Sequence, residues 1–133
     1  RGANCGDCHK TALMTNSIIT NNGLDKQTQD PGFGAITNND KYDGTCKTPT
    51  LRNIELTAPY MHDGRFETLE EVIDHYDMHV QEHKNLDVQI SEAGNYFPGQ
   101  LDLTEEEKKA LIAFLKTLTD YELINDPKYA DPF

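Results

Sequence analysis

Two segments of the chain have the hydrophobic spacing of an amphipathic helix. The first begins after Thr68, and its apolar residues recur at intervals of three and four positions, at Leu69, Val72, Ile73 and Tyr76. The second begins after Thr104, with apolar residues at Leu111, Ile112, Phe114, Leu115 and Leu118. In both segments the opening Thr precedes a Glu by three residues, which is the signature of a capping box. The pattern therefore predicts one helix from residue 69 and another from residue 105.

The remaining stretches are polar and rich in turn-forming residues. Residues 10–47 have few apolar positions and several turn signals, among them Asn21-Asn22-Gly23, Pro31-Gly32 and Asp43-Gly44. Residues 77–103 are also polar and irregular in pattern, and the tail from about residue 120 is expected to be irregular. Long irregular stretches are uncommon in compact domains, so we expect the 10–47 segment to wrap around a bound group. The pattern as a whole predicts an all-α domain with long wrapping loops.

Composition narrows the class of protein. At 133 residues the sequence predicts a single domain, and only 36% of the residues are hydrophobic, which is little for a self-sufficient core. No apolar run is long enough to predict a membrane span. The net charge of −11 excludes nucleic acid as an expected partner, because phosphate binding needs clustered Lys and Arg. An acidic surface instead favours a partner with a basic docking surface, although it also serves solubility alone.

The strongest chemical signal is Cys5-Gly-Asp-Cys8-His9. This spacing is the attachment signature of a c-type haem: each thiol adds across one vinyl group, and the following His ligates the iron. The alternatives are a zinc site, for which a second ligand pair is lacking, and a redox dithiol, for which no βαβ pattern is present. The third cysteine, Cys46, is expected either to be a small buried residue or to be a free thiol able to pair between chains. The motif predicts one covalent haem c, with His9 as its proximal ligand.

Arg52 is the one cation of its mostly apolar segment. A guanidinium in such surroundings suits a buried carboxylate, so Arg52 is a candidate to bind a haem propionate. The competing interpretation is an ordinary surface arginine.

A long central segment resembles a known family. Residues 47–64 (KTPTLRNIELTAPYMHDG) and 66–76 (FETLEEVIDHY) are similar to the C-terminal, electron-transfer haem domain of the bacterial di-haem cytochrome c peroxidase and MauG family, and residues 103–120 resemble that family's closing helix. The resemblance implies a class I-like cytochrome c domain in the bacterial periplasm. It also implies that electrons arrive from a small donor protein, such as a cytochrome or cupredoxin.

The resemblance bears on the sixth iron ligand as well. In the MauG branch this ligand is a tyrosine, and Tyr76 matches its position, whereas the peroxidases use methionine. Met78 is the competing candidate, because His–Met ligation is common in electron-transfer haems. The family also binds calcium between its two domains, partly through carbonyls that match Thr57 and Pro59, but another of the calcium's ligands belongs to the other domain.

Two functions follow from these observations. The first is a mono-haem electron-transfer domain acting between periplasmic redox partners, without peroxidase activity in this chain alone. The alternative is the electron-entry half of a di-haem peroxidase or MauG-like oxidase, whose peroxide-reactive haem lies on a domain outside this sequence.

Overall fold

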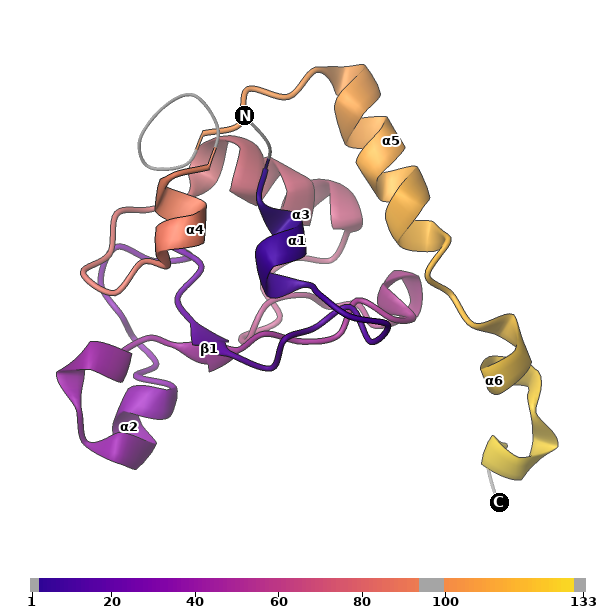
Figure 1. Cartoon of the computed structure of the whole chain (residues 1–133), viewed down its shortest axis with the longest axis horizontal. Helices are drawn as coiled ribbons and strands as arrows, with labels where there is room; N and C mark the ends of the chain where they lie inside the picture. The colour runs from indigo at the N-terminus through magenta and orange to yellow at the C-terminus, as the bar shows by residue number, and fades with distance from the viewer. Residues whose placement is uncertain (1–2, 94–99, 131–133) are drawn as a thin grey trace.

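The computed structural model describes residues 3–93 and 100–130, in which the one longer helix, α5, lies at the edge of a body of short helices and turns (Figure 1). In chain order its elements are α1 (Cys5–Cys8), β1 (Ile19–Thr20), α2 (Phe33–Thr37), the 3-10 turn η1 (Asp40–Tyr42), β2 (Cys46–Lys47), the 3-10 turn η2 (Ile54–Leu56), α3 (Leu69–Asp74), the π-helical turn η3 (His75–His79), α4 (Val88–Ser91), α5 (Glu105–Lys116), α6 (Tyr121–Asn125) and the 3-10 turn η4 (Pro127–Tyr129). Within the described ranges, no helix has the length and apolar character needed to cross a membrane.

The all-α prediction is wrong, because β1 and β2 form a two-stranded antiparallel sheet. Ile19 lies opposite Lys47 and Thr20 opposite Cys46. The pairing continues beyond the strands, where the Thr48 amide donates to the Ile18 carbonyl at 2.8 Å. Strands of two residues have no measurable alternation, so the hydrophobic pattern could not show them. The sheet closes residues 20–46, the larger part of the polar 10–47 segment, into a loop with its ends together.

Short helices also replace parts of the segments predicted to be irregular. The 10–47 segment contains α2 and η1, and the 77–103 segment contains α4, whose N-cap Asp87 accepts a hydrogen bond from Gln89 N. Residues 94–99 of the latter segment lie outside the described residues. The tail also differs from the prediction, because it contains the helix α6. Asp120 caps this helix by accepting a hydrogen bond from Leu123 N. In Figure 1, α6 extends away from the body at the lower right.

Both predicted amphipathic helices are confirmed, and both begin with a complete capping box. The Thr68 hydroxyl accepts from Glu71 N at 3.2 Å, and the Glu71 carboxylate accepts from Thr68 N at 2.9 Å. Thr104 and Glu107 repeat this arrangement at the start of α5. The buried cluster between the two helices consists of Tyr60, Leu69 and Ile112, against which Ile54, Phe66, Val72, Ile73 and Leu115 pack.

The π-helical turn η3 extends α3 and is held at both ends by hydrogen bonds. His75 is buried, and its Nε2 lies 3.1 Å from the carbonyl oxygen of Asn22. Asp77 is only 2% exposed; its carboxylate accepts from Leu103 N at 2.9 Å and pairs with Lys108 Nζ at 2.8 Å. The turn is therefore fixed to the 21–25 loop on one side and to α5 on the other.

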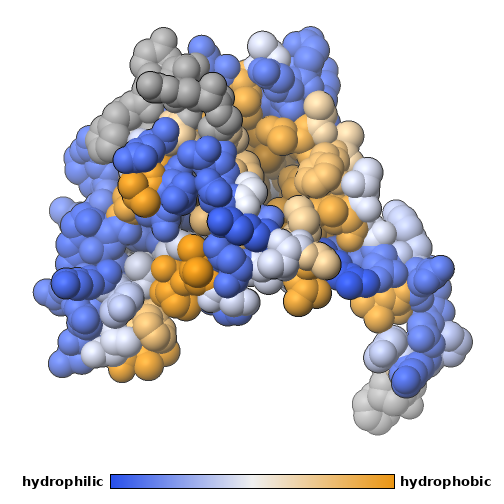
Figure 2. All heavy atoms as spheres, viewed as in Figure 1, coloured by the Kyte–Doolittle hydropathy of each residue, from blue (hydrophilic) through white to orange (hydrophobic). Residues whose placement is uncertain are grey.

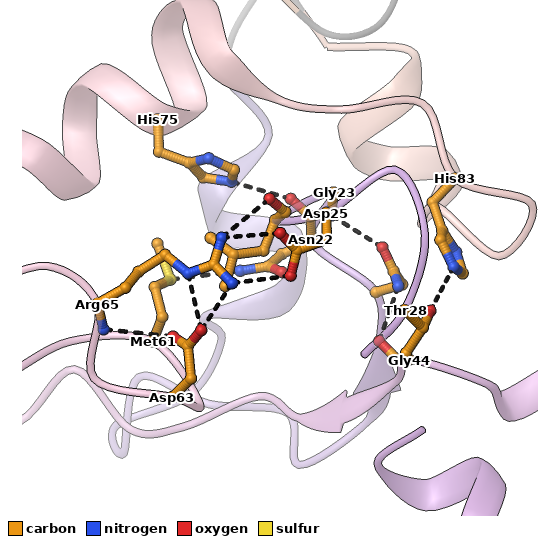
Figure 3. Close-up of polar contacts among 12 residues, drawn as sticks. Asn22, Gly23, Asp25, Thr28, Gly44, Met61, Asp63, Arg65, His75 and His83 are labelled. Atoms are coloured by element: carbon orange, nitrogen blue, oxygen red, sulfur yellow. Dashed lines mark hydrogen bonds and ion pairs between the residues drawn. The ribbon is translucent and has the colours of Figure 1, made fainter. Parts of the chain in front are cut away.

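Arg65 joins the 21–25 loop to the turn that precedes α3 (Figure 3). Its guanidinium donates to both carboxylate oxygens of Asp25, at 2.9 and 2.8 Å, and its Nε donates to Asp63 at 2.8 Å. A further bond reaches the Leu24 carbonyl at 3.3 Å. These hydrogen bonds from Arg65 hold the pKa values of Asp25 and Asp63 below their usual range.

Replacing Arg65 with Met should therefore weaken the fold in a pH-dependent way. Because the folded-state pKa values of the two carboxyl groups are lowered, their contribution is present at neutral pH and is lost as pH falls below about 4. We expect the free energy of unfolding, measured in urea, to fall by about 1 kcal/mol at pH 7, since solvent screens this partly exposed cluster, and by less at pH 3. Lys84→Met, which removes a single exposed pair with Asp43, is the matched control and should change little. An equal loss at both pH values would show that the pairing with Asp25 and Asp63 is not the cause.

Candidate functional site

The short helix α1 presents the two motif thiols. Cys5 and Cys8 are three residues apart on one helical turn, so they lie on the same side of it. The turn is tied to its surroundings: Asn4 Nδ2 donates to Gln89 O at 3.1 Å, and Asn16 Nδ2 donates to Asp7 O at 2.9 Å. Both cysteines are unpaired; Cys5 is exposed and Cys8 partly buried. Burial raises the pKa of each thiol.

His9 follows α1 directly, and its amide donates to Cys5 O at 2.9 Å. Its Nδ1 lies 3.1 Å from the Met14 carbonyl oxygen, which can only accept. This contact favours the tautomer with the proton on Nδ1, in which Nε2 has the lone pair that a metal needs. Burial lowers the pKa of His9 and so favours the neutral ring. The motif thus brings together two thiols and one imidazole prepared for ligation.

The two candidates for the sixth ligand have different surroundings. Tyr76 is partly buried in η3, and its hydroxyl oxygen accepts from Asn22 Nδ2 at 3.5 Å. Burial raises the pKa of Tyr76, and the nearby Cys5 and Cys8 raise it further. Met78 occupies the same turn but is 46% exposed.

Arg52 forms an ion pair with Asp120, at the start of the C-terminal tail. It also lines an open hollow beside the segment that follows the motif, together with Ala12, Met14 and residues 117–122. The hydrogen bonds from Leu123 N and from Arg52 lower the pKa of Asp120. Binding of a haem propionate by Arg52 stays a prediction.

The other metal-related residues lie apart from the motif. Cys46 is partly buried in β2. Thr57 and Pro59, matched to the calcium carbonyls of the family, follow η2, and calcium binding remains untested. Within residues 3–93 and 100–130, no three or more His, Cys, Asp or Glu side chains gather as a group able to hold a metal ion.

Three residues around Tyr76 were not predicted from the sequence: Asn22, His75 and Asp77. Each makes a contact with a residue far away in the chain; Asn22, for example, reaches Tyr76 across 54 positions. Asn21-Asn22-Gly23 was visible only as a turn, and no local pattern indicates what its side chains contact. The sequence holds one indirect signal of these contacts: His75 and Asp77, both polar, flank Tyr76 at the end of an otherwise apolar helix face.

The packing of the protein fits an apolar prosthetic group. No large side chain in the described residues is fully buried, and their buried apolar residues are few: Leu24, Tyr60, Leu69, Val80, Ala93 and Ile112. Large apolar side chains such as Leu13, Leu56 and Phe114 are at least half exposed. Figure 2 shows apolar side chains over α5 and in the recess between α5 and α1. A porphyrin attached to α1 would supply the apolar contacts that this face lacks.

Comparison with known proteins gives relatives that include a cytochrome c peroxidase. No family model matches the chain. It is 33% identical over 120 residues to the methylamine utilization protein MauG of Methylorubrum extorquens, and 32% identical over 123 residues to the cytochrome c551 peroxidase of Nitrosomonas europaea. These matches cover 87% and 90% of this chain but 31% of each relative, so the chain spans about a third of their length. In fold it is similar to a MauG-like protein associated with microbial copper homeostasis, with a TM-score of 0.78 and 36% identity over 98% of this chain and 46% of the other.

The fold and the motif are thus those of a cytochrome c haem domain. By sequence and structure the chain belongs to the di-haem family that contains MauG and the cytochrome c peroxidases. The resemblance inferred from residues 47–64 and 66–76 is confirmed.

Covalent attachment through Cys5 and Cys8 can be tested directly. In protein matured with haem, acid–acetone extraction should leave the pigment on the polypeptide, because thioether bonds survive acid. The double variant Cys5→Ser and Cys8→Ser should release all of its pigment, whereas Cys46→Ser should behave like the parent. Extraction of the pigment from the parent protein would contradict the attachment.

Proposed function

We propose that this chain is a c-type cytochrome domain that binds one covalent haem and transfers single electrons between redox partners in the bacterial periplasm. The observation that carries the proposal is the arrangement at α1: two thiols on one side, followed directly by His9, whose Nδ1 contacts the Met14 carbonyl oxygen. The bound haem would supply a one-electron couple at its iron. The chain's own residues attach the group, orient it and exclude water from it.

Tyr76 is the sixth ligand that the geometry supports best. Its neighbours in η3 are both fixed, His75 to the 21–25 loop and Asp77 to α5, so the phenol cannot easily turn away. Tyr76 is partly buried, and the hydrogen bond that its hydroxyl accepts from Asn22 Nδ2 is long at 3.5 Å, so the oxygen can still accept a further partner such as iron. Met78, by contrast, is an exposed residue. The phenol of Tyr76 would favour ferric iron and lower the reduction potential relative to a methionine ligand.

Two substitutions separate these ligands. Tyr76→Phe keeps the ring and removes only the oxygen, so the ferric spectrum should become high-spin and the reduction potential should rise. Met78→Ala should leave both unchanged. If Met78→Ala produces the high-spin form and Tyr76→Phe has no effect, the domain uses His–Met ligation.

A second function is favoured by the length of the relatives. Since the chain covers 31% of MauG and of the peroxidase, it has the size of one haem domain within a larger di-haem protein. In that setting it would be the electron-entry half, passing electrons to a peroxide-reactive haem on another domain. Calcium would then belong to the junction of the two domains.

Charge indicates the kind of partner in either setting. With a net charge of −11, the domain is suited to a donor or acceptor with a basic docking surface, such as a small cytochrome, a cupredoxin or a haem enzyme. The same charge disfavours nucleic acid.

Electron transfer with a basic cytochrome should therefore slow as salt increases. Raising the ionic strength from about 0.01 M to about 1 M shortens the screening length from about 30 Å to about 3 Å, and we expect the bimolecular rate constant to fall by about tenfold or more. An uncharged hydroquinone is the control donor and should show little change.

Peroxide turnover by the isolated domain should be slow, because a six-coordinate iron offers no open position. Fast peroxide reduction together with salt-independent transfer would contradict the electron-carrier proposal.

A further inference from the structure

The side chain of Asn22 contacts the thioether of Met61 and the hydroxyl of Tyr76. Its amide nitrogen Nδ2 donates to Tyr76 Oη at 3.5 Å and to Met61 Sδ at 3.4 Å. An amide has two N–H groups, so one can serve each acceptor. Figure 3 shows Asn22 between Met61 and His75, whose ring reaches the Asn22 carbonyl.

The backbone around Asn22 is held on both sides. Asn21 O accepts from Asp87 N at 3.0 Å, and Gly23 O accepts from Gln81 N at 2.7 Å. Gly23 has a φ of +67°, and a Cβ there would lie 2.6 Å from Val80 Cγ1, so only glycine permits this close approach. The Asn21 side chain donates to Gly44 O at 2.7 Å and accepts from Gly23 N at 2.8 Å. The Asn22 amide is consequently presented from a rigid position.

Met61 is held in an unusual backbone conformation. Its φ is +74°, in the left-handed region, which is unfavourable for a residue with a side chain. In this conformation its thioether sulfur reaches the Asn22 amide. The same amide therefore contacts both the Met61 sulfur and the Tyr76 hydroxyl.

We propose that Asn22 is a positioning residue for the sixth ligand, whose side-chain amide donates a hydrogen bond to the Tyr76 oxygen while its second N–H holds the Met61 sulfur. The inference rests on the proposed ligation by Tyr76 and deepens it. Asn22 touches the ligand and does not itself bind the iron.

The proposal predicts the direction in which the reduction potential and the charge-transfer band shift when the hydrogen bond is removed. A hydrogen bond donated to a phenolate oxygen withdraws charge from it and makes it a weaker donor to ferric iron. Removal of the donor should strengthen the donation, lower the reduction potential and move the phenolate-to-iron charge-transfer band to longer wavelength. A residue that only stabilised the loop would not shift the band and the potential together in this direction.

The test compares three variants of the haem-loaded protein. Asn22→Leu keeps a similar volume and removes both N–H donors; we expect a lower potential and a charge-transfer band at longer wavelength. Met61→Leu leaves the amide a single acceptor, so it should produce the opposite shifts. Asn85→Leu is the matched control: it removes an asparagine amide that binds only the Asp40 and Asp43 carbonyls, and both readouts should stay at the parent's values.

The outcomes separate this inference from the proposed function. If Tyr76→Phe abolishes the charge-transfer band but Asn22→Leu changes neither band nor potential, the role of Asn22 is refuted while Tyr76 remains the ligand. A parent protein without a band that depends on Tyr76 refutes the ligation, and the inference with it. If Asn22→Leu does not fold, the shifts in Met61→Leu decide, since no change there also refutes the proposal.

Discussion

The buried carboxylate of Asp77 is the group on which the geometry of the candidate site depends. A carboxylate this deeply enclosed is destabilising by several kcal/mol unless it is paired and hydrogen-bonded. Here the Leu103 amide and the Lys108 ammonium meet that requirement, and the Asp77 carbonyl accepts from Leu101 N. A shift of the π-helical turn relative to residues 101–108 would break all three contacts together. Tyr76 precedes Asp77 directly, so its direction is set by the same contacts.

The protein has a small core for its length, and this has a physical explanation. The cluster of Tyr60, Leu69 and Ile112 joins α3 to α5, but it leaves the recess next to α1 without a filling of side chains. Hydrogen bonds and ion pairs instead fix the polar loops, as Arg65 does between Asp25 and Asp63. Such a structure has space for a large apolar group and presents fixed polar groups at its edge.

The parts of the structure that depend on neighbours in sequence could be predicted from it. The Cys5–His9 motif and the capping boxes at Thr68 and Thr104 are local arrangements, so their residues carry the whole signal. The β1–β2 pairing is not local, and its two-residue strands have no pattern that differs from a loop. The choice between Tyr76 and Met78 was open for a related reason. A π-helical turn has more residues per turn than an α-helix, and a period of 3.6 residues does not indicate which side chains turn inward after it begins. Asn22 contributes through contacts more than 50 positions away, which no spacing rule detects.

The two capping boxes also bear on the order in which the protein matures. α3 and α5 each contain their own start signal, and the apolar cluster between them includes no residue of the attachment motif. This pair of helices can therefore assemble while Cys5, exposed on a single helical turn, is still accessible to the cell's attachment machinery. A group attached through Cys5 and Cys8 would then be added to a scaffold in which the contacts between α3 and α5 do not depend on it.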